Sequence, residues 1–504
     1  MSERKDIFYP SLNLLLAFFL LNVVLQPLTD PDFWWHLRSG VDLIHNGWSP
    51  PATDPYSHTL PDWPWVNHSW LLDGIIGMVY TSLGPFGLLG VILLFAGIRA
   101  AAFILSADLS RVGWPYRLLA VAGALWVARP FLGATHMTTL LGLAVVLWLS
   151  DRYLTGHEAP LWVIPPVFLL WANLHAGFPA GLVVLLVIGC VSAVARLVVT
   201  RWPALADRID EPVMTWVHIR RFTWCTVASG LATFANPYGW RLHEEIYQTL
   251  SDPLSMTKVV HWQTTTFTDP TGIRYGVDLA ALALAAALFY RRVEPIRLAV
   301  LTTCLVTSLL HWYLIPLFLL VSVPLWADLL AACTVRLRAA CPTMQTYPKR
   351  WLLVMTLIAA LTLGALGPGH MQQVARSGLA PEQFFRRTWY PIEAIQWVQA
   401  NRHLVGARLL NHFDYGGFLL WWLPDVKVFI DGRMPYWNLD DRRIFSDYLA
   451  LFKNPPALGV LDKYHVDWAL MKSGSRLDTT LSGLPDWQVL YRDRKATVYV
   501  KRRK

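Results

Sequence analysis

Two aspartates, Asp30 and Asp32, stand directly after the first long apolar run of the chain, where a helix would leave a membrane. Charged side chains beside apolar helices are costly, so by default they mark functional sites. A carboxylate in this place can act as a general base on a hydroxyl or amine, or it can hold a metal ion that binds a phosphate. The alternative is that Asp30 and Asp32 only cap the next helix, as aspartate often does.

The residues after Asp32 predict a helix that lies flat in the membrane interface. The segment FWWHLRSGVDLIHNG has helical period, with an apolar stripe made by Trp34, Leu37, Val41 and Ile44. Asp32 then stands at the N-terminus of this helix, and Gly47 stands at its end. The loop that follows carries Asp54 and His58 and leads back to an apolar run.

Histidine and aspartate are proper ligands for divalent metal ions, and the segment 30–70 is rich in both. The side chains that can combine with Asp32 in a metal site are His36, Asp54, His58 and His68. Their spacing matches no fixed ligand pattern, so a hydrogen-bonded loop that holds the helix rigid is the alternative. A divalent metal ion is the one cofactor to consider.

Composition sets the class of protein. Of the 504 residues, 55% are hydrophobic and 15% are charged, which excludes an ordinary water-soluble globule and indicates a polytopic membrane protein. The five cysteines lack CxxC spacing, which argues against a zinc site or a disulfide framework. The formal charge of +9 suits anionic lipid headgroups or a phosphate-bearing substrate better than nucleic acid. Most of the 26 tryptophans are expected in interfacial belts.

Apolar runs recur from the N-terminus to residue 366 and predict roughly 11–13 transmembrane helices. They cover residues 10–28, 71–83, 88–105, 118–132, 138–149, 161–174, 181–199, 222–234, 277–290, 296–310, 312–330 and 351–366. The first run is expected to be an uncleaved anchor, because residues 1–9 do not form a signal peptide. The basic segments 201–221 and 336–350 are expected in the cytoplasm. The polar segment 235–275, with a short amphipathic helix at 243–248, is expected on the same side as the segment 30–70.

We expect a transmembrane domain over residues 1–368, with an external loop at 30–69 and a polar loop at 235–275, and then a linker and a small soluble α/β domain over 369–504. Helical patterns at 391–402, 442–452 and 455–464 alternate with strand-like ones at 407–411, 426–431, 466–471, 487–491 and 496–500. This alternation predicts a small sheet with helices.

The segment from Asp32 through Gly47 to Pro51 resembles the first external loop of GT-C-type glycosyltransferases, the superfamily of protein O-mannosyltransferases and lipid A aminoarabinose transferases. A closer resemblance is to bacterial multi-spanning proteins described as GT-C-like, which share the motifs DPDFWWHLRSG, DPYSHT, WVNHSWL, WANLHAGF, ANPYGW, FDYGGFLLWWLP and VFIDGR. These motifs span almost the whole chain. The superfamily usually has adjacent Asp-Glu, whereas this chain has Asp32-Phe33 with Asp30 two residues earlier, which leaves open which aspartate is catalytic.

The resemblance implies a helical GT-C-like fold in the bacterial inner membrane, with the active site and the C-terminal domain on the external, periplasmic face. It also implies a polyprenyl-phosphate sugar as donor, which enters from the outer leaflet, and transfer to a glycan, lipid or protein acceptor. The acidic residue of the first loop is the base in that family. Carried over, this role falls to Asp32, with Asp30 as assistant or alternative.

Departure of a phosphate leaving group requires cations or hydrogen-bond donors around it. Substrate-binding candidates beyond the first loop's histidines and aspartates are Arg38, Arg129, His136, Asn173, His175, Asn236 and Arg241. The alternatives are snorkelling of Arg129 to the interface, an interhelical hydrogen bond for His175 and the ordinary basic face of an interfacial helix for Arg38.

The C-terminal segment carries two strong turn signals, Gly416-Gly417 and Asp431-Gly432-Arg433. The functional interpretation is that Asp431 and Arg433 contribute to the acceptor site, because active-site loops often follow a strand. The alternative is a structural Asp–Arg pair in a turn.

Two further functions compete with a glycosyltransferase. A transporter or flippase of a lipid-linked saccharide would also place histidine and arginine in a helical bundle, but the halves of the sequence show no internal repeat. A non-catalytic assembly subunit with a GT-C-like core is the other, because Asp32 is not followed by glutamate.

Overall fold

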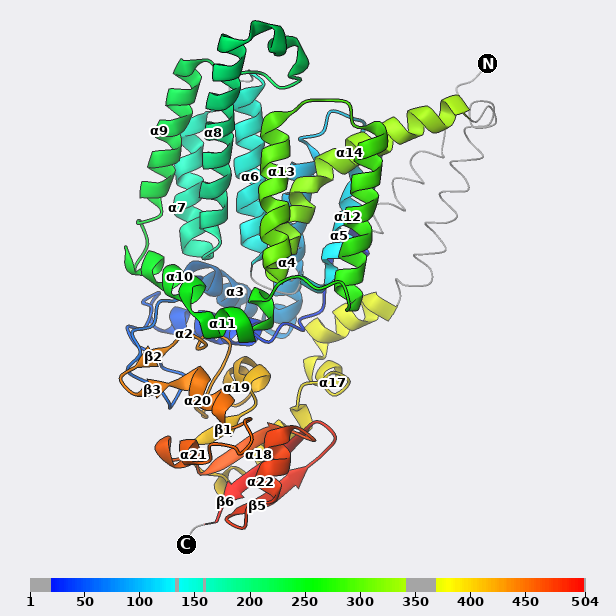
Figure 1. Cartoon of the computed structure of the whole chain (residues 1–504). Helices are drawn as coiled ribbons and strands as arrows, with labels where there is room; N and C mark the ends of the chain where they lie inside the picture. The colour runs from blue at the N-terminus through cyan, green and yellow to red at the C-terminus, as the bar shows by residue number, and fades with distance from the viewer. Residues whose placement is uncertain (1–19, 132–135, 157–159, 341–368, 503–504) are drawn as a thin grey trace. The chain divides into compact units, whose positions relative to one another are not determined.

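The computed structural model describes residues 20–131, 136–156, 160–340 and 369–502 (Figure 1). Its contacts divide the chain into two compact units. We call the first, Met1–Gln26 with Ile92–Gly239 and Val260–Val374, the bundle unit. The second, Pro27–Val91 with Trp240–Val259 and Ala375–Lys504, is the α/β unit. Segments far apart in sequence thus fold together, and the segment after the first apolar run belongs with the C-terminal residues.

The bundle unit is built from apolar helices. They are α4 (Gly87–Ala107, which begins in the α/β unit), α5 (Trp114–Ala128), α6 (Met137–Leu154), α7 (Ile164–Leu174), α8 (Phe178–Arg201), α9 (Trp216–Ala232), α12 (Pro270–Phe289), α13 (Pro295–Leu310) and α14 (Ile315–Ala340). Within the described residues, five helices are long and apolar enough to cross a membrane. The chain is an integral membrane protein, and the predicted helical membrane fold is confirmed. The predicted run 351–366 and most of the run 10–28 lie outside the described residues.

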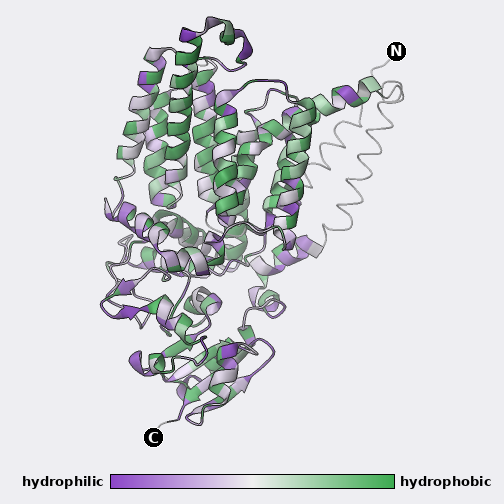
Figure 2. Ribbon diagram, viewed as in Figure 1, coloured by the Kyte–Doolittle hydropathy of each residue, from purple (hydrophilic) through white to green (hydrophobic). Residues whose placement is uncertain are grey.

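Apolar side chains on the outside of the bundle unit fit a lipid solvent. Trp224 and Leu231 on α9 and Val277 and Leu284 on α12 are each more than 60% exposed. Figure 2 shows α12 as hydrophobic over most of its length and α9 as a mixture of hydrophobic and polar residues. The exposed apolar side chains of α12, which is long and apolar enough to cross a membrane, are those expected to face lipid.

In the α/β unit, α2 (Phe33–His45) and α3 (Trp70–Leu83) pack backbone against backbone. A β-carbon on Gly40 would lie 1.9 Å from the carbonyl oxygen of Asp73, and one on Gly77 would lie 2.5 Å from the carbonyl carbon of Gly40. Only glycine permits this approach. The helix α2 ends at His45, two residues before Gly47, whose φ is 63°, and the amide of Trp48 donates back to the carbonyl of Leu43 at 2.8 Å.

The C-terminal part of the α/β unit contains a four-stranded sheet in the order β1-β4-β6-β5. Its strands are β1 (Leu409–Asn411), β4 (Trp468–Lys472), β5 (Trp487–Arg492) and β6 (Ala496–Lys501). β1 and β4 are parallel, and the other pairs are antiparallel. The helices around it are α17 (Pro381–Phe385), α18 (Ile392–Ala400), α19 (Gly416–Trp422), α20 (Ile444–Ala450), α21 (Gly459–Lys463) and α22 (Arg476–Ser482), and a short hairpin joins β2 (Asn438–Leu439) to β3 (Arg442–Arg443). The predicted small sheet with helices is confirmed.

One predicted strand, residues 426–431, is wrong. These residues form no ladder; Val428 makes only an isolated parallel bridge to Ser57. The side chain of Asn411 replaces a neighbouring strand, because its Oδ1 accepts from the amide of Phe429 at 2.8 Å and its Nδ2 donates to the carbonyl of Ile430 at 2.8 Å. A buried side-chain amide therefore satisfies the backbone that sequence pattern assigns to a sheet.

Candidate functional site

The carboxylate of Asp32 lies at the start of α2, where a glycine of the C-terminal part makes room for it. A β-carbon on Gly432 would stand 2.0 Å from Oδ1 of Asp32, closer than any real contact. Asp32 is the N-terminal flanking residue of α2, yet its side chain makes no capping hydrogen bond to that helix. The structure thus shows no capping role for this carboxylate, which was the alternative to a functional one.

The side chain of Asp30 lies beside the backbone of Asp32. We call the side chains of Asp30 and Asp32 together the Asp30–Asp32 corner. Oδ1 of Asp30 accepts from the amide of Asp32 at 2.9 Å. Burial raises the pKa of the Asp30 carboxyl, while that hydrogen bond and the charge of His36 oppose the rise. The hydroxyl of Tyr390 donates to the carbonyl of Thr29 at 3.1 Å, and burial raises the pKa of Tyr390 well above its ordinary value.

Helix α19 holds the segment before α2 in place. A β-carbon on Gly417 would lie 2.5 Å from the carbonyl oxygen of Pro31, so the second glycine of the motif admits that backbone. The buried ring of Trp34 packs edge-on against Phe385 and Phe418 with centroid distances of 5.1 and 5.2 Å. Both turn signals of the C-terminal sequence therefore face the segment that carries Asp32.

His36 lies one helical turn after Asp32 in a buried polar network. Its Nδ1 is 2.7 Å from Oδ1 of Asp73 on α3, and Oδ2 of Asp73 accepts from Nδ2 of Asn67, also at 2.7 Å. The hydroxyl of Ser69 lies 3.1 Å from the same Nδ1. Asp73 is fully buried, so His36 and Asn67 are the groups that stabilise its carboxylate.

Asp54, Asp431 and Arg433 form a buried ion-pair cluster. The guanidinium of Arg433 donates to both carboxylate oxygens of Asp431, at 2.9 and 2.6 Å, and to Oδ1 of Asp54 at 2.8 Å. Four rings surround its Cζ at 4.9 to 6.0 Å, those of Trp65, Tyr56, Trp437 and Trp35. Burial alone would lower the pKa of Arg433, but the two carboxylates offset it and hold the pKa above its ordinary value. These contacts join the segment 30–69 to the C-terminal residues; a role in contacting an acceptor stays a prediction.

Two further histidines of the segment 30–69, His58 and His68, are held neutral. Burial lowers the pKa of His58 to about 4, and Nε2 of its ring donates to the carbonyl of Leu409 at 2.7 Å. Burial and the charge of His36 lower the pKa of His68 to about 4, against the effect of Asp73. Both rings are therefore neutral imidazoles near pH 7.

Two predicted arginines of the α/β unit bind nearby protein groups. Nε of Arg38 donates to Asp42 one turn later on α2 at 2.7 Å, and Arg241 on α10 (Arg241–Ser251) reaches the carbonyl of Pro64 at 3.3 Å. The predicted short helix at 243–248 lies within α10. On the same helix Glu245 is buried and accepts from the hydroxyl of Tyr436, and burial raises the pKa of Glu245 to about 7.

Two basic side chains of the bundle unit, those of Arg99 and His136, are buried. Arg99 on α4 is 1% exposed and donates to the carbonyls of Phe95 and Val24 at 3.0 and 2.7 Å. Arg129 contacts Nδ1 of His370 at 2.5 Å. His136 is 2% exposed, and within the described part of the chain neither of its ring nitrogens has a hydrogen-bond partner.

The remaining predicted residues of the bundle unit make local structure. Nδ2 of Asn173 donates to the carbonyls of Leu169 and Ala235, and Nδ1 of His175 accepts from the amide of Gly177 and contacts Thr139. Asn236 organises the turn after α9 through Thr233, Tyr238 and Gly239. Substrate contacts by these three side chains stay predictions.

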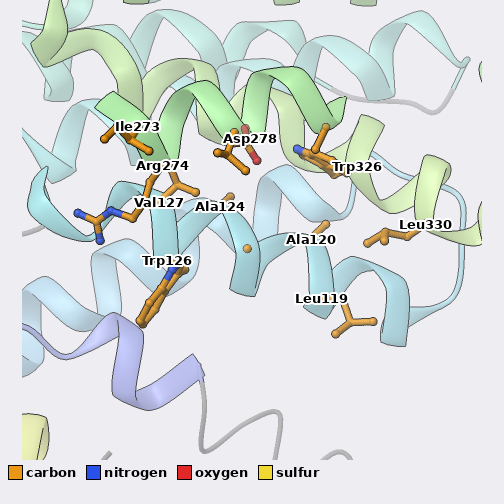
Figure 3. A pocket seen from close by; sticks show the side chains of 13 residues that line it. Leu119, Ala120, Ala124, Trp126, Val127, Ile273, Arg274, Asp278, Trp326 and Leu330 are labelled. Atoms are coloured by element: carbon orange, nitrogen blue, oxygen red, sulfur yellow. The ribbon is translucent and has the colours of Figure 1, made fainter. Parts of the chain in front are cut away.

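A cavity of about 460 Å³ lies between α5, α12 and α14 of the bundle unit (Figure 3). Its walls are mostly apolar, with Arg274 and Asp278 on α12 and Trp126 and Trp326 on the facing helices. The charge of Arg274 acts on Arg129, so the two cations are near each other. The cavity therefore combines an apolar lining with one cation, Arg274, and one carboxylate, Asp278.

The candidate metal ligands do not come together. Within the ranges that the structure describes, no group of three or more histidine, cysteine, aspartate or glutamate side chains is arranged to hold a metal ion. His58 binds a main-chain carbonyl and Asp54 binds Arg433, so neither is directed at Asp32.

The chain resembles known proteins in fold rather than in sequence. No protein-family model matches the sequence, and no curated protein matches it. The archaeal oligosaccharyltransferase AglB from Archaeoglobus fulgidus, solved with an inhibitory peptide and a dolichol-phosphate, superposes with a TM-score of 0.59 over 94% of this chain and 70% of that chain, at 14% identity. The chain has a GT-C-type fold. Another A. fulgidus oligosaccharyltransferase structure, tethered to an acceptor peptide with the NVT sequon, gives a TM-score of 0.49 at 13% identity over 93% of this chain and 69% of that one.

Sequence reasoning missed several polar residues of this GT-C-type fold, most clearly Asp73 and Arg99. Each is a single charge inside an apolar run, in WLLDGIIG and AGIRAAAF. A lone charge in an apolar run is itself a signal for a buried polar site, and it would have found both. Glu245, in contrast, looks like one of many charges on an exposed amphipathic helix.

Proposed function

We propose that the protein is a membrane glycosyltransferase that moves a sugar or glycan from a lipid-linked donor to an acceptor, with Asp32 as general base. The observation that carries the proposal is the placement of the Asp32 carboxylate, which does not cap its helix and is accommodated by Gly432. The GT-C-type fold supports it, and the similar AglB structure was solved with a dolichol-phosphate and a peptide.

The reaction that we propose requires one base and one leaving group. The acceptor's O–H or N–H bond breaks as its proton passes to the carboxylate of Asp32, and the acceptor's electron pair forms the bond to the anomeric carbon. The bond from that carbon to the phosphate oxygen breaks, and its electron pair leaves with the lipid phosphate. Asp30 lies beside Asp32 and is the assistant or alternative base.

The bundle unit supplies groups suited to the donor. Arg129 and His136 remain our candidates for the phosphate, and the structure adds Arg99 and Arg274 to the basic groups of this unit. The apolar cavity between α5, α12 and α14 suits a stretch of prenyl chain. Buried cations and donors stabilise charge that develops on a leaving phosphate.

We further propose that the donor is a polyprenyl-phosphate sugar and that the protein lies in a bacterial inner membrane, with the α/β unit on the periplasmic side. The buried contacts between the external loop and the C-terminal residues support placing both on one side of the membrane, because a soluble fold must form in one compartment. The division into a transmembrane domain over 1–368 and a C-terminal domain over 369–504 is part of this proposal.

The test uses purified protein in liposomes with lipid-linked saccharides extracted from the cells that produce it. Wild-type protein should consume a lipid-linked saccharide and release its lipid phosphate, as measured by mass spectrometry. Asp32→Asn should lower that rate by about 10²–10⁴-fold, the usual contribution of a general base. Asp62→Asn is the matched control, because Asp62 lies in the same loop and its side chain is 76% exposed.

The two parts of the proposal fail separately. No consumption of any lipid-linked saccharide by folded wild-type protein would overturn the glycosyltransferase. Consumption at the wild-type rate by folded Asp32→Asn would overturn Asp32 as the base, and Asp30→Asn would then be measured next.

A further inference from the structure

Helix α12 carries a carboxylate inside a membrane span. The helix runs from Pro270 to Phe289 and is long and apolar enough to cross a membrane. Asp278 lies about 12 Å along it from its first residue. A charged side chain at such a depth is costly and marks a functional site by default. Asp278 has no role in the proposed sugar transfer, so its presence has another reason.

Asp278 lines the cavity of about 460 Å³ between α5, α12 and α14 (Figure 3). Trp326 on α14 lines it too, with its indole nitrogen turned toward the carboxylate. The two side chains are close enough to influence each other, yet within the described part of the chain neither Oδ2 of Asp278 nor Nε1 of Trp326 has a partner in hydrogen-bond geometry. Buried polar atoms almost always have one. The pair therefore indicates a polar group that the chain itself does not provide.

Arg274 lines the same cavity one helical turn before Asp278. Its Nε donates to the carbonyl of Pro270 at 3.1 Å, and its Nη2 donates to the hydroxyl of Thr271 at 3.4 Å. Both acceptors are neutral, and Figure 3 shows the guanidinium directed away from Asp278. Four residues along a helix correspond to about 6 Å and to one face. The cavity thus presents a cation and a carboxylate about one turn apart.

The wall of this cavity reaches the lipid-facing surface of the bundle unit. Leu119, Ile273 and Val277 belong to the wall, and each is at least 50% exposed. In a membrane protein, exposed apolar side chains of this kind face lipid, so an amphiphile can reach the cavity from the bilayer. The apolar runs 10–28 and 351–366 contain no lysine, arginine or histidine, so neither run supplies a cation for Asp278.

The polar groups of the cavity specify the chemistry of a ligand. Arg274 and Trp326 require an acceptor, such as a phosphate oxygen, whereas Asp278 requires a hydrogen-bond donor. A prenyl chain fits the apolar walls but leaves Asp278 and Trp326 without partners. A lipid phosphate alone serves the two donors only, and it adds a negative charge to a site in which the formal charges of arginine and aspartate already balance. A zwitterionic headgroup meets all of these requirements.

We propose that this cavity binds a phospholipid with a primary ammonium in its headgroup, of the phosphatidylethanolamine class. Arg274 binds the phosphate, Oδ2 of Asp278 accepts from the ammonium, and the apolar walls hold acyl chain. A two-carbon linker separates the two charges of this headgroup, which suits side chains one helical turn apart. The lipid is not the sugar donor, so the inference goes beyond the proposed function. The donor's prenyl chain competes with it for the apolar walls.

The test measures the affinity of the purified full-length protein in detergent for single phospholipids by native mass spectrometry. Three lipids with identical acyl chains separate the interactions. Phosphatidylethanolamine offers a phosphate and an ammonium that donates, phosphatidylcholine has a quaternary ammonium without an N–H, and phosphatidylglycerol has no cation. Wild-type protein should bind phosphatidylethanolamine about 10-fold or more tightly than either of the others, because each lacks the charged hydrogen bond to Asp278.

Two variants test the polar groups. Asp278→Asn should lower the affinity for phosphatidylethanolamine to that for phosphatidylcholine. Arg274→Gln should weaken the binding of all three lipids by about 10-fold, because the phosphate is common to them. Arg291→Gln is the matched control, since Arg291 is an exposed arginine just beyond the other end of α12 and bonds only to neighbouring carbonyls there.

A third variant tests the cavity without changing a charge. Gly123 lines the cavity, and a β-carbon there meets nothing within 4 Å, so the side chain of Gly123→Leu can enter the space without a clash. It should abolish the selective binding of phosphatidylethanolamine. Gly97→Leu on α4 is the control, because a β-carbon at Gly97 also meets nothing within 4 Å.

Three results would overturn the inference. One is equal affinity of the wild-type protein for the three lipids. Another is selective binding that persists in folded Asp278→Asn and Gly123→Leu, because a different site would then be responsible. The third is tighter binding of polyprenyl phosphate than of phosphatidylethanolamine, undiminished in Asp278→Asn, which would assign the cavity to a prenyl chain alone.

Discussion

Gly432→Ala tests whether Asp32 works from the position in which the structure holds it. The added β-carbon would lie 2.0 Å from Oδ1, 2.9 Å from Cγ and 3.1 Å from Oδ2 of Asp32, whereas ordinary contacts begin at 3.4 Å. The carboxylate must therefore move by about 1.4 Å. Because a misplacement of about 1 Å can cost 10²-fold in rate, we expect transfer to fall about 100-fold or more.

The fold should tolerate this change. The end of the Asp32 side chain can rotate away, and an off-rotamer torsion costs about 0.5–1.5 kcal/mol, little against the stability of a whole chain. Thermal unfolding in detergent should therefore shift by only a few degrees. Gly459→Ala is the control, because a β-carbon at that glycine of the α/β unit meets nothing within 4 Å.

A double variant decides whether the loss acts through Asp32. If it does, Gly432→Ala combined with Asp32→Asn should be no slower than Asp32→Asn alone, since the group that the alanine displaces has already lost its function. Additive losses would show that Gly432 acts elsewhere. A rate within twofold of wild type for folded Gly432→Ala would refute the argument from this contact.

Two further predictions concern stability. Arg433→Met should destabilise the protein by about 3–5 kcal/mol, because Asp54 and Asp431 would be left buried without their cation. Denaturant unfolding measures this loss of stability. A loss no larger than that caused by Arg442→Met, at a more exposed arginine, would contradict the prediction. Burial raises the pKa of Glu245 from 4.5 to about 7, so the folded protein binds this proton more tightly than the unfolded chain does. The stability of the fold should therefore fall as the pH rises from 4.5 to about 7 and level off above that. Glu245→Gln should remove about 3 kcal/mol of that dependence in unfolding measured at pH 4.5 to 8, and an unchanged pH dependence would contradict this origin.

The elements that periodicity sets alone were predictable. The stripe of Trp34, Leu37 and Val41 predicted α2, and Gly47 predicted its end to within two residues, because helical period and a glycine stop are local properties of the chain. The apolar runs within the described residues coincide with helices for the same reason. Ile392 and Ile395 lie on the buried face of α18, as their spacing predicts.

What depended on long-range contacts was not predictable. The strand predicted at 426–431 was wrong because the side chain of Asn411 bonds to this backbone in place of a neighbouring strand. Local sequence pattern cannot reveal a contact with a residue so far away in the chain. The meeting of Gly432 with Asp32 joins residues 400 positions apart, and a lone Asp-Gly-Arg turn gives no sign of it. Asp73 could have been suspected from its charge, but its contact with His36 depends on the crossing of two helices at Gly40.

The glycines at 417 and 432 have a consequence for how such a chain can evolve or be engineered. One fits the carbonyl of Pro31 and the other the carboxylate of Asp32, while Arg433 neutralises Asp54. The C-terminal part is therefore not an interchangeable cassette. A domain swap with a single junction near residue 369 would combine a first loop and a C-terminal part that do not fit each other. A functional chimera therefore has to inherit both from the same parent.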